Sequence, residues 1–235
     1  MLHPEAPLIL RAFLAVHIAA GTLARFVVPL VMAVRKGGTI HRRFGRVFVY
    51  SMFVVAATAL VCGPYFHDYF LVLIAVFSSY LTFVGWRALK RKDPARTPAA
   101  PLDWAAAALA TAAGATMIAL GELQRAQFGS FSLVLFALGA ICTGAGVRSI
   151  VRFVRPPRAR AAWLFEHFGQ LLAAYIATVS AFSAVNFHFI QPVWLRWLWP
   201  TVVGTIVITA YMTHYKIRIA RGVALRRLVV IADAA

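Results

Sequence analysis

The sequence predicts an all-α integral membrane protein, a bundle of seven transmembrane helices with its N-terminus outside and its C-terminus in the cytoplasm. Three observations lead to this prediction. Of the 235 residues, 62% are apolar and only 13% are charged, about half the charged share of a soluble domain. The apolar residues form seven runs, each long enough to cross about 30 Å of hydrocarbon. The basic residues gather in alternate connections between these runs.

The composition excludes several classes of protein. A soluble globule of this size could not cover so much apolar surface, because its exterior must stay wetted. The two cysteines, Cys62 and Cys142, fall on separate apolar runs, so no disulfide scaffold or zinc site is expected. The runs are continuous rather than alternating, which excludes a transmembrane β-barrel. No phosphate-binding loop, HExxH or GxSxG motif is present.

The seven predicted helices follow one another with short connections. They cover approximately residues 12–34, 40–63, 68–89, 102–121, 130–151, 162–188 and 193–215. No basic region precedes the first of them, so we expect it to stay in the membrane as a helix rather than be cleaved as a signal peptide. No internal repeat is visible, and the inverted repeat of many secondary transporters is therefore missing.

Breaks in the chain justify these boundaries in order. Gly37-Gly38-Thr39 separates the first helix from the second, with Thr39 as the expected N-cap. Pro64 ends the second helix, and the polar stretch 92–101 separates the third from the fourth. Pro156-Pro157 stops the fifth helix, and Pro192 separates the sixth from the seventh.

The charge distribution predicts the orientation. The formal net charge is +17, and 20 of the 24 Lys and Arg residues lie in four clusters within residues 35–46, 87–96, 148–160 and 216–227. The connections between these clusters hold only Arg125 and Arg196, which is the positive-inside pattern. The clusters therefore belong on the cytoplasmic side of a bacterial inner membrane, with anionic lipid rather than nucleic acid as their partner.

The domain organisation follows from these boundaries. We predict one transmembrane domain over residues 1–217, in contact with the lipid bilayer throughout. A basic cytoplasmic tail follows over residues 218–235, with a composition suited to an interfacial helix.

Histidines are the candidate ligands of a b-type haem. Such a haem, held by two imidazoles, needs both at similar depth on different helices. Three candidates lie toward the cytoplasmic end of the bundle, namely His41, His167 and His214. The fourth candidate, His17, lies toward the outer end. Glycine follows His17 and His41 four residues on, which leaves room on the same helical face for a flat ring or for close helix contact. The alternative is that these histidines are structural and bond to backbone or lipid.

Arg25 lies in the middle of the first predicted helix, close to the helical face of His17. A charged side chain at this depth is costly and normally faces a partner or a water-filled cavity. The expected partner is an anion, a haem propionate or a quinone oxygen. The alternative partner is the backbone that Pro29 leaves unpaired.

The sixth predicted helix carries the most polar side chains, so we expect it to face the bundle interior or a cavity. The candidate residues of this polar cavity are Glu166, Gln170, Tyr175 and Asn186. Hydrogen bonds between helices are the structural alternative. A retinal-binding pump is excluded, because Lys216 lies at the cytoplasmic end of the last helix rather than in its middle.

Several stretches resemble a known family. They are LHP and HIAAG near the start, KGGTIHRRFGRVFVYSM, FEHFGQLLAAYIATVSAFSAVNF and WPTVVGTIVI. These stretches are similar to the bacterial predicted membrane proteins grouped as domain of unknown function 2306. The resemblance implies one polytopic helical domain, and it assigns no roles. The residues that it places in the family pattern are His17, His41, Arg42, Gly45, Arg46 and His167.

Three functions are compatible with these features. We rank electron transfer first. In this function the clustered histidines bind haem b, alone or together with a quinone, and Arg25 contacts a propionate or a quinone oxygen. The second is a small-molecule or proton-coupled transporter, with a cavity lined by the sixth helix and Arg25, where His167 and Glu166 relay protons. The third is an accessory subunit that packs against a membrane-protein partner.

Overall fold

The computed structural model describes residues 6–94, 96–159 and 161–224, and this part of the chain contains helices and no strands. The helices are α1 (Leu8–Ala33), α2 (Thr39–Tyr65), α3 (Tyr69–Arg87), α4 (Pro101–Leu123), the short α5 (Arg125–Phe128) and η1 (Gly129–Phe131), α6 (Ser132–Val154), α7 (Ala162–Asn186) and α8 (Val193–Ala220). Within these residues, seven helices are long and apolar enough to cross a membrane. The predicted all-helical class with seven such helices is therefore confirmed.

The predicted boundaries differ from the observed ones mainly at the two ends. Helix α1 begins at Leu8, four residues before the predicted start, and α8 continues to Ala220, five residues past its predicted end. In both places basic residues interrupt the apolar run, and the predicted helix therefore stops there. The backbone nevertheless stays helical, because long cationic side chains can extend away from an apolar surface. The predicted domain boundary at residue 217 thus falls inside α8. Residues 225–235 of the predicted tail lie outside the described residues.

The start of α2 also corrects a detail of the prediction. Gly38, in extended conformation, is the N-cap, and Thr39 is the first helical residue rather than the cap. No side chain caps this helix, so the hydroxyl of Thr39 does not define where it begins.

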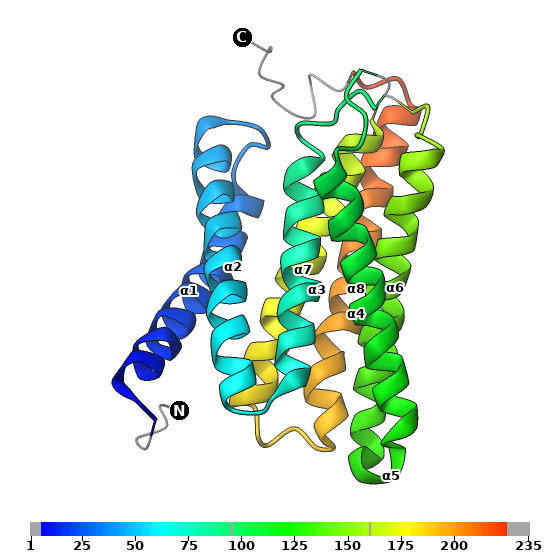
Figure 1. Ribbon diagram of the computed structural model, residues 1–235. Helices are drawn as coiled ribbons and strands as arrows, with labels where there is room; N and C mark the ends of the chain where they lie inside the picture. Colours follow the sequence, from blue (N-terminus) through cyan, green and yellow to red (C-terminus); the bar gives the residue numbers. More distant parts are fainter. Residues whose placement is uncertain (1–5, 95, 160, 225–235) are drawn as a thin grey trace.

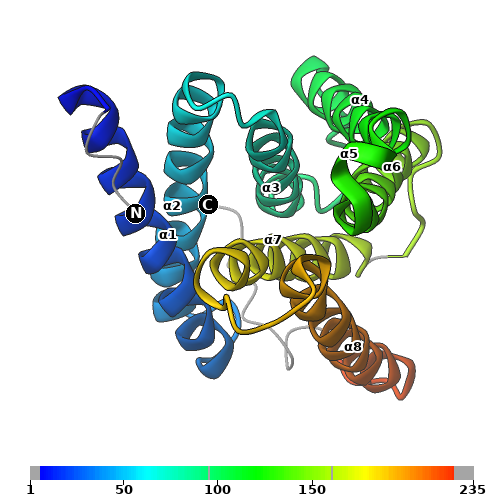
Figure 2. The same ribbon diagram turned by 90° about the horizontal axis from the view of Figure 1, so that it is seen from below.

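Helix α7 occupies the middle of the bundle. Figure 2 shows it between α3 on one side and α8 on the other, with α1 and α2 beyond one of its ends. The remaining helices pack mostly as neighbours in sequence, α1 on α2, α2 on α3, and α4 on α6 (Figure 1). Side chains of α7 therefore face several helices, and the two sides of α7 can serve different cavities.

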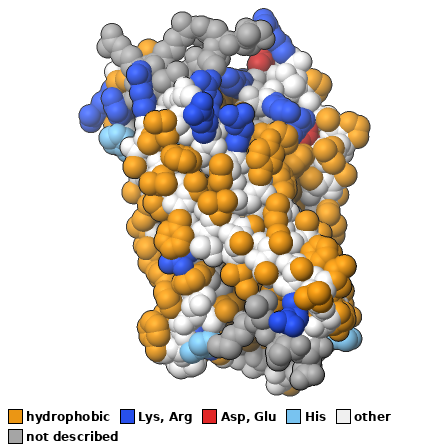
Figure 3. All heavy atoms as spheres, turned by 90° about the vertical axis from the view of Figure 1, so that its left-hand side faces the viewer, with side chains coloured by type: hydrophobic (Ala, Val, Ile, Leu, Met, Phe, Trp, Pro, Cys, Tyr) orange, Lys and Arg blue, Asp and Glu red, His pale blue; other side chains and the backbone are white. Residues whose placement is uncertain are grey.

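Most of the described cationic side chains gather at one end of the bundle, which we call the basic end. It comprises the connections 34–38, 88–94, 96–100 and 155–159, together with the last turns of α8. Figure 3 shows blue side chains concentrated there and an apolar surface below them. At this end two ion pairs tie helices together, Arg87 to Asp103 between α3 and α4, and Arg152 to Glu166 between α6 and α7.

Candidate functional site

A pocket of about 770 Å³ opens at the basic end between α2 and α7, and we call it the basic-end pocket. Its residues come from the end of α1, the connection to α2, the first turns of α2 and α7, and the end of α3. Those that matter below are His41, Arg42, Arg43, Gly45, Arg46, Phe48, Trp86, Trp163, His167 and Phe168. Its volume lies within the range of ligand sites, about 300–1,000 Å³.

The pocket exists because α2 diverges from α3 toward the basic end (Figure 1). At the opposite end α2 and α3 touch, since a Cβ added to Gly63 would lie 2.6 Å from a methyl group of Val72. Helix α3 stays close to α7 at the basic end, where a Cβ on Gly85 would lie 2.8 Å from Leu171. The resulting wedge separates α2 from α7, and the pocket occupies it.

Two of the predicted histidines line this pocket from different helices. His41 is in the first turn of α2, and His167 is in the second turn of α7. His41 Nδ1 lies 3.3 Å from the carbonyl oxygen of Val31, and His167 Nδ1 lies 2.9 Å from that of Gly85. A carbonyl oxygen only accepts, so each Nδ1 carries the proton and each Nε2 keeps a free lone pair. Both rings are thus oriented as nitrogen ligands or hydrogen-bond acceptors.

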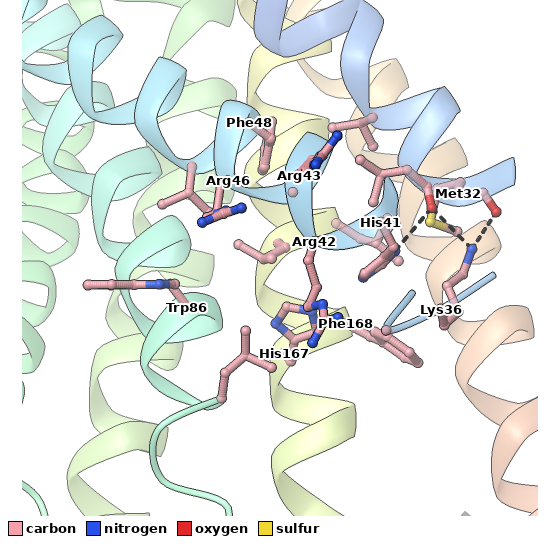
Figure 4. Close-up of a pocket in the computed structure, with 18 of the residues that line it drawn as sticks. Met32, Lys36, His41, Arg42, Arg43, Arg46, Phe48, Trp86, His167 and Phe168 are labelled. Carbon is pink, nitrogen blue, oxygen red and sulfur yellow. Dashed lines mark hydrogen bonds between the residues drawn. The ribbon is translucent and has the colours of Figure 1, made fainter. Parts of the chain in front are cut away.

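Cationic side chains surround the two histidines. Arg42, Arg43 and Arg46 are exposed and line the pocket, and none of the three has a hydrogen bond or ion pair among the residues that the structure describes. Figure 4 shows the Arg42 side chain reaching toward the His167 ring. Free guanidinium groups are strong partners for carboxylates and phosphates. The pocket is therefore suited to a ligand with anionic groups.

Lys36 also lines the pocket, but unlike these arginines its side chain is hydrogen-bonded to the protein backbone. Its ammonium group is buried and donates to the backbone carbonyl oxygens of Val31, Met32 and Val34 at the end of α1 (Figure 4). Burial lowers the pKa of this ammonium below its ordinary value. Because the three carbonyls occupy its donors, Lys36 acts as a cap of α1.

The interior of the pocket is apolar and has space for a ring. Phe48 and Leu164 are almost fully buried in its walls, and Phe168 is mostly buried. A Cβ added to Gly45 would meet no atom within 4 Å, so the side chain missing there leaves open space beside His41. Of the two interpretations of the His41–Gly45 spacing, the structure thus favours open space on the helical face over close helix contact.

His17 and Gly21, with the same spacing, behave differently. His17 Nδ1 lies 2.9 Å from Thr58 Oγ1 and 3.1 Å from the carbonyl oxygen of Val55, both on α2. A Cβ on Gly21 would lie 3.8 Å from Val55, which is ordinary contact between helices. His17 lies sixteen residues from the end of α1, about 24 Å along the helix, and does not line the basic-end pocket.

His214 and Arg25 also lie away from this pocket. The His214 ring is exposed on α8, with its neighbour Tyr215 in edge contact at 5.8 Å. The Arg25 guanidinium carbon lies 3.6 Å from the centre of the Phe182 ring, a cation–π contact between α1 and α7. Arg25 has no hydrogen bond to the backbone within the described ranges, so the backbone near Pro29 is not its partner there, and the expected anion, propionate or quinone oxygen stays a prediction.

The predicted polar cavity of α7 is only partly assembled. Glu166 and Gln170 line another cavity, of about 350 Å³, which lies between α3, α6, α7 and α8. We call it the second cavity. Tyr175 is half-buried and packs on the core, outside this lining. Asn186 is exposed at the end of α7, where its amide donates to the carbonyl oxygen of Phe182 at 2.9 Å.

Some lining residues were not singled out from the sequence. Trp86 and Trp163 line the basic-end pocket beside its arginines, and Arg148 lines the second cavity. The tryptophans carry a visible signal, since each lies within a few residues of a basic cluster at a helix end. Arg148 carries no such signal, because the cavity requires helices that are distant in sequence.

In the part of the chain that the structure describes, no group of three or more His, Cys, Asp or Glu side chains lies close enough together to hold a metal ion. The pair of imidazoles expected from the sequence as haem ligands stays a prediction. No family model, no curated protein and no solved structure matches this chain. The resemblance to domain of unknown function 2306 stays a prediction from the sequence.

Proposed function

We propose that this chain is a multi-pass protein of a bacterial inner membrane that holds one b-type haem in the basic-end pocket and transfers electrons. His41 and His167 would hold the haem iron in this proposal. The basic end faces the cytoplasm, as the positive-inside pattern requires, so α1 starts outside and α8 ends inside. The chain crosses the membrane seven times, through the helices that have the necessary length and hydropathy.

One observation carries the proposal. Two imidazoles from different helices line one pocket, and each gives its Nδ1 proton to a backbone carbonyl so that Nε2 is available. Carbonyl oxygens in this position fix the ring orientation and raise the basicity of the ligating nitrogen. His41 and His167 both lie within the first two turns of their helices, so they are at similar depth.

The rest of the pocket fits the same group. Arg42 and Arg46, whose guanidinium groups have no partner among the described residues, would pair with the two propionates. The open space at Gly45 accommodates the edge of a planar ring, while Phe48 and Phe168 exclude water from its faces. Haem supplies a one-electron redox centre, and the protein tunes its potential through axial ligands, burial and nearby charge.

Haem content in a set of variants tests the proposal. We expect about one haem per chain in the purified wild-type protein, and less than about a tenth of this amount in His41→Ala and in His167→Ala, because a b-type haem is held through its axial ligands. Gly45→Leu should lower haem content as well, since its side chain enters the pocket. The measurement is haem per protein after extraction, from cells supplied with a haem precursor.

Two matched variants serve as controls. His214→Ala removes an exposed histidine, and Gly144→Leu places a side chain in the second cavity, so both should keep the wild-type haem content. Stoichiometric haem in His167→Ala would exclude His167 as a ligand. Equal loss in all variants would indicate a folding defect rather than an axial pair.

The geometry supports the transporter hypothesis less well than it supports haem binding. It requires a cavity shared by Arg25 and α7, whereas Arg25 lies against Phe182 and lines neither the basic-end pocket nor the second cavity. His167 and Glu166, the expected proton relay, open into different cavities. We therefore keep haem-based electron transfer as the proposed function.

A further inference from the structure

The second cavity lies on the opposite side of α7 from the basic-end pocket. His167 lines the basic-end pocket and its neighbour Glu166 lines the second cavity, so α7 separates the two. Figure 2 shows α7 between α3 and α8, which together with α6 form the walls of the second cavity. Its residues play no part in the proposed haem site, and it needs an explanation of its own.

The end of the cavity nearest the basic end carries a net positive charge. Arg152 Nη1 donates to Glu166 Oε1 at 2.6 Å, which neutralises this pair. Arg148 lines the same end, and its guanidinium has no hydrogen bond or ion pair within the described residues. One cationic group is thus left over at the mouth, which suits a singly charged anion.

The far end of the cavity holds a polar group that the protein leaves unsatisfied. Ser180 is 3% exposed and lines the cavity, and its Oγ has no hydrogen-bond partner among the described residues. Serine in a helix ordinarily bonds back to a carbonyl one turn earlier, and this bond is missing here. The hydroxyl is therefore free to donate to an oxygen of an occupant.

The distance between these two ends fixes the length of an occupant. Glu166 and Ser180 are fourteen residues apart on α7, about 21 Å along the helix. Between them the walls are mostly apolar, with Phe77 and Leu81 from α3 and Ile176 from α7. The cavity is long and narrow, a shape that fits one extended hydrocarbon chain.

The cavity can be reached from the side of the bundle. Gly144 on α6 and Thr205 on α8 are exposed and also line it. A Cβ on Gly144 would meet no atom within 4 Å, so this part of the wall is open. In a bilayer this opening faces lipid, which gives a lipophilic molecule a lateral entrance.

We propose that the second cavity binds a long-chain monocarboxylate that carries a second oxygen near the far end of its chain. The carboxylate pairs with Arg148 beside the Arg152–Glu166 pair, the chain lies along α7, and the Ser180 hydroxyl donates to the distal oxygen. This inference is independent of the haem proposal, because no residue of the basic-end pocket takes part.

Binding of two matched probes tests the proposal. Hexadecanoate and 16-hydroxyhexadecanoate differ only in the distal oxygen, and both are measured against the full chain in lipid nanodiscs. We expect saturable binding of both, with the hydroxylated probe about tenfold tighter because it satisfies the Ser180 hydroxyl. Ser180→Ala should reduce this ratio to about one and leave hexadecanoate binding unchanged.

Two further variants separate the site from unspecific partitioning into lipid. Gly144→Leu should weaken both probes at least about tenfold by filling the cavity, whereas Gly45→Leu fills the basic-end pocket and should change neither. Arg148→Gln should weaken both probes equally. Unsaturable binding, equal affinity for the two probes, or an unchanged ratio in Ser180→Ala would overturn the proposal and leave water as the partner of Ser180.

Discussion

The candidate histidines differ in whether a ring nitrogen is free to bind a ligand in the basic-end pocket. His41 and His167 give Nδ1 to a backbone carbonyl and present Nε2 to one pocket, while His17 is held between α1 and α2 and His214 is exposed. The sequence alone predicts the residue types and their depth. It cannot predict which histidines share a cavity, because that depends on how far α2 stands from α7.

Arg25 illustrates the same limit at a single residue. Its mid-helix position predicts a partner, and within the protein that partner is the face of Phe182. Aromatic residues are frequent in this chain, 18 of them phenylalanine, so the pattern of residues does not indicate which one meets Arg25.

The ion pair between Arg87 and Asp103 yields a prediction about stability. Arg87 Nε and Nη2 donate to the two carboxylate oxygens of Asp103 at 2.7 Å each, and the Asp103 side chain is 3% exposed. Asp103→Ala should lower the free energy of unfolding by about 3 kcal/mol, because it leaves a partly buried guanidinium unpaired. Unfolding of the purified protein in detergent, followed by circular dichroism, measures this change.

The exposed pair of Glu122 and Arg125 provides the comparison. Its atoms are 3.8 Å apart and both side chains are more than half exposed. Glu122→Ala should change the free energy of unfolding by less than about 1 kcal/mol. Similar effects of Asp103→Ala and Glu122→Ala would contradict the structural role of the Arg87–Asp103 pair.

At the scale of elements, close packing of α4 on α6 depends on glycine. A Cβ on Gly114 would lie 2.4 Å from Thr143 Oγ1 and 2.7 Å from the carbonyl oxygen of Gly139. Small residues in apolar runs are visible in the sequence and are typical of helix interfaces in membranes. Which two helices they join is not visible, because glycine and alanine occur in several of the runs.

Alanine substitution at two glycines tests this interface. Gly114→Ala should lower the free energy of unfolding by about 2 kcal/mol, because the added methyl group collides with the backbone of α6. Gly144→Ala, on α6 itself, meets open space and should leave stability unchanged or raise it by up to about 1 kcal/mol through helix propensity. The same unfolding measurement applies, and equal loss in both variants would refute the packing argument.

At the scale of the whole molecule, hydropathy and charge predict more than any motif does. Seven apolar runs become seven long helices, and most of the described basic residues gather at one end of the bundle. The central position of α7 does not follow from hydropathy. Its many polar side chains predict an interior position, but only the packing of α3 and α8 on its two sides divides them between two cavities.

Reporter fusions test the proposed orientation. Green fluorescent protein fused after Ala235 should fluoresce, because the proposal, which follows the positive-inside pattern, places this end in the cytoplasm. Alkaline phosphatase inserted in the connection 187–192 should be active, since that connection lies at the opposite end, which is outside in the proposal. Loss of fluorescence together with an inactive phosphatase would invert the orientation.

The most direct measurement of the central claim is the absorption spectrum of the purified wild-type protein in detergent. The protein is isolated from cells supplied with a haem precursor, and the spectrum is recorded oxidised and then after reduction by dithionite. A b-type haem between His41 and His167 predicts a Soret band and an α band that both shift on reduction. A colourless preparation of the folded protein would contradict the proposed function.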